Sequence, residues 1–275
     1  MASIERVRRR VGVVVLRAAS MSAVALAAPM AHAAGPWVDR PLTLPSGDWA
    51  FDFGLGVGQA PGPDRTGVGV NAEVAVGFLS RFELGVRTGL RVGDEPTRAI
   101  NADDYGRLFD RQTLPPGAEG AAVLANPEVR FVGALVRSEV VELGLEGRVV
   151  FPFADGSVAG MLFGVPMAFH LGDRVRLDTG AYLPTVFYRN DTVVGLNLPL
   201  DVWIQATRRL WLGPMTGLAF DYLGDRRSNT AVSLGFGLGY QFTHALDLKT
   251  MFLFPEINDE SRVFGAGVGL EVRVE

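Results

Sequence analysis

The most informative features of this 275-residue chain are those that it lacks. It contains no cysteine, which excludes a disulfide framework and any thiolate that could bind a metal or act as a nucleophile. Beyond the N-terminal region it has no run of about 20 nearly uncharged apolar residues, so no transmembrane helix is predicted. The chain is nevertheless 48% hydrophobic and contains 34 glycines. A closed barrel can carry such a composition into lipid without helices, because its strands satisfy one another's backbone groups.

Residues 1–33 have the form of an export signal. A basic start is followed by an apolar run, and Ala31-His32-Ala33 fits the small-x-small pattern at which such signals are cleaved. Removal of this segment would leave 21 basic and 29 acidic residues, a formal net charge of −8. Because phosphate binding requires a positive surface, this balance argues against a nucleic acid as a partner.

Two stretches, residues 68–78 and 82–92, show the pattern that the rest of the chain repeats. In each stretch apolar residues alternate with polar residues and glycine, and a short turn separates the two. Strand side chains point alternately to the two faces of a sheet, so the pattern predicts an antiparallel hairpin with one apolar face. Each arm has about the 9–11 residues with which a tilted strand crosses a bilayer.

The same alternation continues to the end of the chain. It predicts an all-β fold, a single closed antiparallel transmembrane β-barrel of about 12 strands with up-and-down topology. We expect residues 34–48 to form a periplasmic N-terminal lead and residues 49–275 to form the barrel. Short connections alternate with longer polar ones, of which residues 93–126 are the longest and are expected to form an extracellular loop. This alternation predicts that both termini of the barrel face the periplasm.

The apolar face is predicted to point outward, into lipid. Charged residues within the expected strands all fall on the opposite face, and an arginine or lysine facing mid-bilayer would cost about 2–4 kcal/mol. Glycine also crowds the polar face, for example at Gly235, Gly237 and Gly239. On a face that meets water each strand glycine would cost about 0.5–1 kcal/mol relative to alanine. On the inner wall of a curved barrel, small residues relieve crowding.

From Trp49 to Glu275 the chain resembles the outer-membrane β-barrel superfamily of Gram-negative bacteria. The resemblance lies in the architecture, in the export signal and in the last strand. There, Gly267-Val268-Gly269-Leu270-Glu271-Val272 is similar to the terminal signal that the barrel-assembly machinery reads. The resemblance implies a location in the outer membrane, contact with outer-membrane lipid and insertion by that machinery. It indicates neither a subfamily nor an oligomeric state.

The polar face supplies a set of candidate lumen residues of mixed charge. One interpretation is a pore lining that biases the passage of small polar or charged solutes. Another is a network of ion pairs that crosses the lumen and closes it. Both stay open, because barrels of roughly eight strands are filled and those of roughly sixteen are open. The candidate lumen residues are Glu73, Glu83, Arg87, Arg91, Arg130, Glu142, Glu146, Arg148, Arg176, Asp178 and Asp201.

The long connection contains a second candidate feature. Asp103 is placed to cap a short helix on which Tyr105, Leu108 and Phe109 share one face. We hypothesise that this segment, which also includes Asp104, folds inward and constricts the mouth of the barrel. Its acidic residues lack the ordered ligand series of a known calcium-binding loop, so no metal site is predicted. Nothing in the sequence indicates a cofactor.

These features predict an outer-membrane β-barrel that acts as a passive, porin-like channel for small polar solutes. The alternative is a closed barrel with a salt-bridged lumen and a structural or surface-interaction role. A lipid hydrolase of the outer membrane is a third interpretation, and it requires a serine placed beside a histidine. His170 is expected to face inward without a serine in a recognisable motif, and His244 lies in a tight turn. We therefore predict no enzymatic activity.

Overall fold

The computed structural model describes residues 35–59, 66–93, 127–152, 159–187, 192–222, 229–254, 257–258 and 264–275. The predicted export signal lies outside these residues. So does the predicted constriction, with Asp103, Asp104, Tyr105, Leu108 and Phe109. Within the described ranges, no helix is long and apolar enough to cross a membrane.

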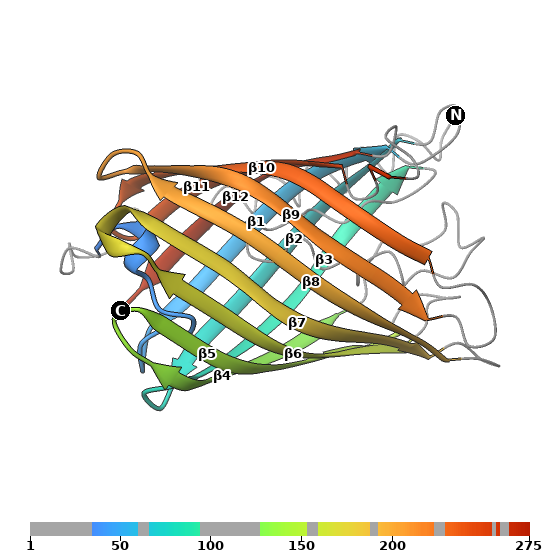
Figure 1. Cartoon of the computed structure of the whole chain (residues 1–275), viewed down its shortest axis with the longest axis horizontal. Coiled ribbons are helices and arrows are strands. Elements are labelled where there is room, and N and C mark those ends of the chain that lie inside the picture. Colours follow the sequence, from blue (N-terminus) through green and yellow to red (C-terminus); the bar gives the residue numbers. More distant parts are fainter. Residues whose placement is uncertain are drawn as a thin grey trace, which may run out of the picture.

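Twelve strands form a single sheet in the described part of the chain, and the sheet closes on itself (Figure 1). Each strand pairs antiparallel with its neighbours in the sequence, and β1 pairs with β12, beginning with Trp49 opposite Val274. The strands are β1 (Trp49–Gln59), β2 (Thr66–Phe78), β3 (Phe82–Gly93), β4 (Glu128–Arg137), β5 (Val141–Val150), β6 (Ala159–His170), β7 (Val175–Phe187), β8 (Thr192–Gln205), β9 (Leu210–Tyr222), β10 (Asn229–Thr243), β11 (Leu246–Phe254) and β12 (Phe264–Val274). Two 3-10 turns, η2 (Trp37–Asp39) and η4 (Gly172–Arg174), complete the described elements.

Short turns gather at one end of the barrel, which we call the turn end, together with the start of β1 and the end of β12 (Figure 1). These turns are residues 79–81, 138–140, 171–174, 206–209 and 244–245. In outer-membrane barrels the short turns face the periplasm. The predicted closed barrel, its up-and-down topology and its number of strands are confirmed.

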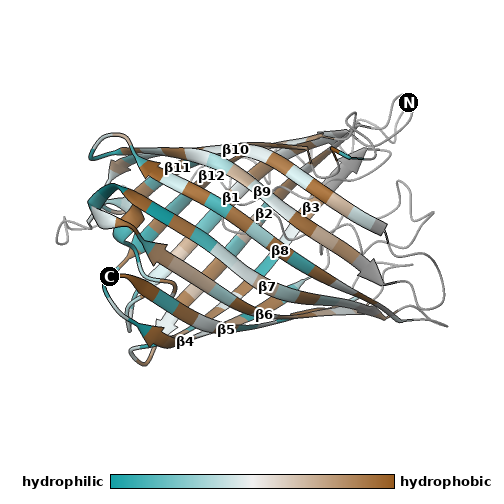
Figure 2. Ribbon diagram, in the orientation of Figure 1, coloured by the Kyte–Doolittle hydropathy of each residue, from teal (hydrophilic) through white to brown (hydrophobic). Residues whose placement is uncertain are grey.

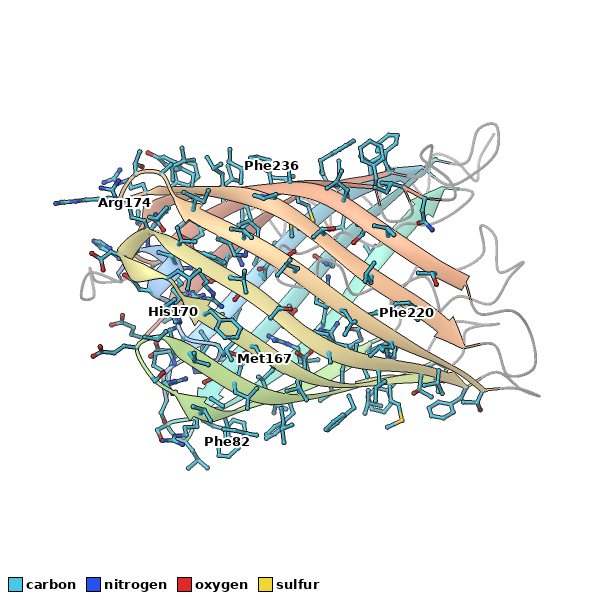
Figure 3. The ribbon with its side chains drawn as sticks, in the orientation of Figure 1. Phe82, Met167, His170, Arg174, Phe220 and Phe236 are labelled. Carbon is cyan, nitrogen blue, oxygen red and sulfur yellow. The ribbon has the colours of Figure 1, made fainter. Side chains whose placement is uncertain are left out.

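Large apolar side chains cover the outside of the barrel. Phe53, Val86 and Phe163 are each 50% exposed, and Phe82 and Phe236 project from the outer surface in Figure 3. Figure 2 shows hydrophobic and hydrophilic residues alternating along the strands. In water so extensive an apolar surface would cause the molecules to associate. In a bilayer the same surface contacts the apolar lipid tails. The predicted outward direction of the apolar face is confirmed.

Glycines on the inner face of β10 make room for aromatic side chains from β9 and β8. A Cβ atom on Gly239 would lie 2.0 Å from the ring of Trp211, and one on Gly237 would lie 2.6 Å from the ring of Trp203. Both distances are far shorter than an ordinary carbon–carbon contact of about 3.5–4.0 Å. The predicted relief of crowding therefore has a specific form here, because these glycines let two tryptophans pack against the inner wall.

Two strands continue through proline. A proline donates no backbone N–H, so Pro199 and Pro214 are expected to weaken the pairing around them. In the structure, Pro199 on β8 lies opposite Gly217 on β9, and Pro214 on β9 lies opposite Phe236 on β10. Because each of these strands has a partner on both sides, the neighbouring rungs of the ladder keep the register.

Candidate functional site in the lumen

The barrel encloses the predicted lumen residues whose side chains the structure describes on its inner wall. Arg91 lies on β3, and its side chain is outside the described part of the structure. The other residues are buried or half-buried inside a lumen that is expected to be polar. The buried ones are Glu83, Arg87, Glu142, Glu146, Arg148, Arg176 and Asp201, and the half-buried ones are Glu73, Arg130 and Asp178.

Ion pairs join these residues along the wall. Arg130 on β4 lies 2.6 Å from Glu83 on β3 and 3.0 Å from Glu73 on β2. Arg148 on β5 lies 3.2 Å from Glu128 on β4. The strands concerned are neighbours or next neighbours in the barrel. These pairs therefore neutralise charge within one wall, and they do not bridge opposite sides of the lumen.

A second group of charges lies on β11, β12 and β1. Lys249 contacts Glu271 directly and lies 3.7 Å from Asp52, and Arg273 also contacts Glu271. Asp247 is opposite Glu271 in the ladder between β11 and β12 and is 1% exposed. The carboxylates of this wall group thus outnumber its cations by one.

The balancing charge comes from the N-terminal lead, which lies inside the turn end of the barrel (Figure 1). Arg40 of the lead contacts Asp247 and lies 3.5 Å from Glu271. Val38 and Thr43 are each 1% exposed, so these parts of the lead are as buried as a protein core. The sequence predicts a periplasmic lead, and the structure places this segment across the opening at the turn end.

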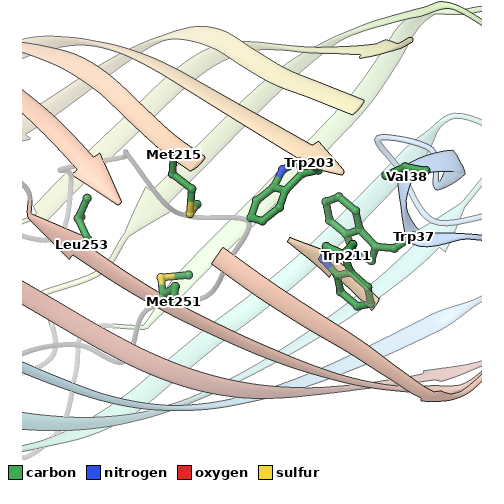
Figure 4. Close-up of a cluster of buried hydrophobic side chains, with 7 residues drawn as sticks. All are labelled: Trp37, Val38, Trp203, Trp211, Met215, Met251 and Leu253. Carbon is green, nitrogen blue, oxygen red and sulfur yellow. The ribbon is translucent and has the colours of Figure 1, made fainter. Parts of the chain in front are cut away.

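Trp37 packs the lead against the inner wall (Figure 4). Its ring stacks on Trp211 with centroids 5.2 Å apart and planes at 7°, and it meets Trp203 edge-on at 5.2 Å. The Arg176 guanidinium lies 5.0 Å from the centroid of the Trp37 ring, within the range of a cation–π contact. Each aromatic pair contributes about 0.5–1.5 kcal/mol beyond the area that it buries. The apolar cluster continues along the wall through Met215, Met251 and Leu253 (Figure 4).

Hydrogen bonds join the lead to one residue on each strand from β3 to β8. The backbone N–H of Leu44 donates to Glu83 at 2.9 Å, and that of Leu42 donates to Glu142 at 3.0 Å. The other four bonds are Arg137 to the Thr43 hydroxyl at 2.7 Å, His170 Nδ1 to the Val38 carbonyl at 2.8 Å, Arg176 to the Arg40 carbonyl at 2.6 Å, and Val38 N–H to Gln205 at 3.3 Å. The lead therefore spans the lumen.

The end of the lead approaches β2 so closely that only glycine fits there. A Cβ atom on Gly77 would lie 1.9 Å from the carbonyl oxygen of Pro45. The N–H of Gly47 donates to the Gly77 carbonyl at 2.8 Å, and the Gly77 N–H donates to the Asp48 carbonyl at 2.9 Å. Gly47 has φ 97, a conformation that glycine adopts without steric cost. The lead thus joins the wall through backbone as well as side chains.

A cavity of about 160 Å³ lies between the lead and the wall. Trp37, Arg40, Leu42 and Leu44 form its side on the lead. Most of the predicted lumen residues meet there, and they come from β2 through β8. Those that line the cavity are Glu73, Glu83, Arg130, Glu146, Arg176, Asp178 and Asp201, whereas Arg87, Glu142 and Arg148 lie elsewhere on the wall.

The alternating pattern does not identify the residues that close the turn end. Asp247, Lys249 and Glu271 fall on the predicted polar face, but the pattern does not distinguish them from other charges there. Trp37 and Arg40 stand in a short segment without alternation. A tryptophan and an arginine in an otherwise plain, proline-bearing lead are the one local signal that could have indicated docking.

No protein-family model and no curated protein matches the chain. Solved structures match its fold. A COG4313 outer membrane channel from Pseudomonas putida F1 has a TM-score of 0.59 at 9% identity, covering 86% of this chain and 99% of that one. A KdgM porin has a TM-score of 0.54 at 10% identity, covering 82% and 99% of the two chains. A NanC porin has a TM-score of 0.54 at 11% identity, covering 81% and 100%.

Identities this low carry information about the fold alone. The similarity extends over the whole barrel, and it agrees with the apolar exterior and the short turns at one end. The chain therefore shares the fold of these outer-membrane β-barrels.

Proposed function

We propose that the chain is an outer-membrane channel for small polar solutes, which the N-terminal lead holds closed at the turn end. One observation carries this proposal. Among the described residues, the ion pairs given above join wall charges along the wall, as Arg130 does with Glu83, whereas the lead makes contacts with strands all the way from β3 to β8. Ion pairs between wall residues on opposite sides of the lumen would close it permanently. The lead is covalently joined to the barrel at Trp49, and non-covalent contacts hold the rest of it, so it can leave.

The similar folds give this proposal further support. The matching structures are described as porins or as a channel, and one KdgM porin was solved in complex with disordered oligogalacturonate. Those descriptions apply to those proteins. For this chain they favour passage of a polar solute over the other two functions, and the cavity lined by acidic and basic side chains agrees with that choice.

Single-channel conductance in planar bilayers tests the proposal. Deletion of residues 37–43 removes the aromatic stack and most of the hydrogen bonds across the lumen, so we expect larger and more frequent conductance steps than with the unaltered protein. The double variant W37A/R40A should change conductance in the same direction without shortening the chain. Trp49→Ala is the matched control, because Trp49 is 44% exposed on the outer surface at the same end. Its conductance should equal that of the unaltered protein.

A closed structural barrel is the second candidate. The extent of the contacts between the lead and the wall favours it, because every strand from β3 to β8 contributes a hydrogen bond. Folded protein that lacks residues 37–43 and conducts no ions would contradict the channel and favour this alternative. Folding is checked independently by the mobility of unheated samples in gels.

A lipid hydrolase is the least supported function. The His170 ring is engaged by the lead, with Nδ1 2.8 Å from the Val38 carbonyl and Nε2 3.4 Å from Glu142. The hydroxyl of Ser138, in the turn between β4 and β5, donates to the Val141 carbonyl. These contacts give both side chains structural roles in this conformation. Lipid hydrolysis by purified protein in detergent micelles, abolished by His170→Ala, would reverse this ranking.

A further inference from the structure

We propose that Asp247 and Glu271 form a binding site in the lumen for a solute that carries a guanidinium or primary amine group, and that Arg40 occupies this site while the lead is docked. The inference rests on the proposed function, because a solute reaches this site only through an open lumen. It adds the chemical class of the solute and a reason for the lead to leave.

Asp247 and Glu271 both approach the one cation of the lead, and Glu271 also contacts Lys249 and Arg273. The two carboxylates lie opposite each other in the ladder between β11 and β12, on the inner face of the barrel. Asp247 is 1% exposed and Glu271 is 4% exposed. The Arg40 guanidinium contacts Asp247 and lies 3.5 Å from Glu271, so it already shows how a planar cation fits between them.

Charge balance couples the lead to a replacement cation. With Arg40 in place, the carboxylates of Asp52, Asp247 and Glu271 are matched by three positive side chains. When Arg40 leaves, one buried negative charge in this group is no longer compensated. A buried charge without its partner is strongly unfavourable, so a cation that enters from solution favours the state in which the lead is withdrawn.

The neighbouring aromatic wall favours an organic cation over a bare metal ion. The strand register places Trp211 on β9 and Lys249 on β11 opposite the same residue, Gly239 on β10. Asp247 is two residues from Lys249 on the same face, so Trp211 and Asp247 share the inner wall, with β10 between their strands. Docking of the lead covers this ring with Trp37. Withdrawal uncovers an indole face on the same inner wall as the two carboxylates, and indole faces attract organic cations.

The test uses the absence of cysteine from the chain. Thr43→Cys introduces a single thiol at a lead position that is 1% exposed, and the rate at which a maleimide labels it reports withdrawal of the lead. Agmatine, which carries a guanidinium and an amine, is added to the full-length protein in lipid vesicles. Sodium chloride at equal ionic strength is the control for screening. We expect agmatine to raise the labelling rate about tenfold, within the usual range for two coupled sites.

Variants of the site identify where agmatine acts. In the Thr43→Cys background, D247N and E271Q should label faster without agmatine and should lose most of the response to it. R40A should behave likewise, and it leaves both carboxylates in place. Glu128→Gln is the matched control, because Glu128 is a buried wall carboxylate that pairs with Arg148 on the other side of the barrel. Its response to agmatine should be intact.

Two results would overturn the inference. One is equal labelling in agmatine and in sodium chloride, and the other is an undiminished agmatine response in D247N, E271Q and R40A. Neither result affects the proposed function, which stands or falls with the conductance of protein lacking residues 37–43. Conduction by that variant together with a null agmatine result would leave a channel without this site.

Discussion

A pair of substitutions on one strand tests whether the outer surface faces lipid. Phe236 and Phe242 both lie on β10, and each is 46% exposed on the outer surface. Phe236 is at the middle of Asn229–Thr243, and Phe242 is beside the turn end. Replacement of each by arginine removes the same apolar side chain and adds the same charge. The two variants differ in the depth at which the charge is placed.

The expected difference follows from the position of each residue along the strand. Six residues at about 3.4 Å each separate the two by roughly 20 Å along the strand, enough to move from mid-bilayer to its interface. An arginine costs about 2–4 kcal/mol at the midplane and about 0–1 kcal/mol near the interface. Phe236→Arg should therefore destabilise the barrel by about 2–3 kcal/mol more than Phe242→Arg does. That corresponds to roughly a 30- to 150-fold difference in the folding equilibrium constant.

The assay is reversible unfolding in urea from vesicles of fixed lipid composition, with the free energy of unfolding compared among the two variants and the unaltered protein. Phe242 also contacts the Tyr240 ring at 5.2 Å, and loss of this contact adds to the cost at the turn end. The loss of this contact therefore reduces the expected difference in destabilisation between Phe236→Arg and Phe242→Arg. Equal destabilisation by the two substitutions would refute the assignment of this surface to the bilayer.

The remaining predictions concern the inner wall. Gly239→Ala should destabilise the barrel by about 1–3 kcal/mol, the usual cost of overpacking, because its Cβ would lie 2.0 Å from the Trp211 ring; urea unfolding measures it. Arg130→Met should cost about 3 kcal/mol in the same assay, because it leaves the carboxylates of Glu73 and Glu83 enclosed without the cation that lies within 3.0 Å of both.

Each of these predictions has a matched control in the chain. A Cβ on Gly147 would meet no atom within 4 Å, so Gly147→Ala should be neutral or slightly stabilising. Arg208 is exposed in the turn between β8 and β9, and Arg208→Met should change stability by less than about 0.5 kcal/mol. Equal effects at Gly239 and Gly147, or at Arg130 and Arg208, would show that the inner wall is less tightly packed than the structure indicates.

The barrel could be predicted from the sequence because the residue pattern that specifies each strand is local. Alternation with a period of two decides which face of each strand is apolar, and the cost of a charge in lipid keeps that face free of arginine and lysine. Residues such as Glu73, Arg130 and Arg148 could therefore be placed on the inner face without knowledge of their partners. The short turns, read in order, were enough to give the up-and-down topology.

The closure of the turn end could not be read in this way, because it depends on contacts between residues far apart in the chain. Arg40 and Asp247 are 207 residues apart, and Val38 and Gln205 are 167 apart. These partners meet only after the sheet has closed and has brought β3 to β8 and β11 to β12 around one opening. By itself, the sequence determined a ring of strands with its apolar face outward. Tertiary structure alone decided that the N-terminal lead crosses the opening, because its binding energy comes from a wall that exists only once the ring is complete.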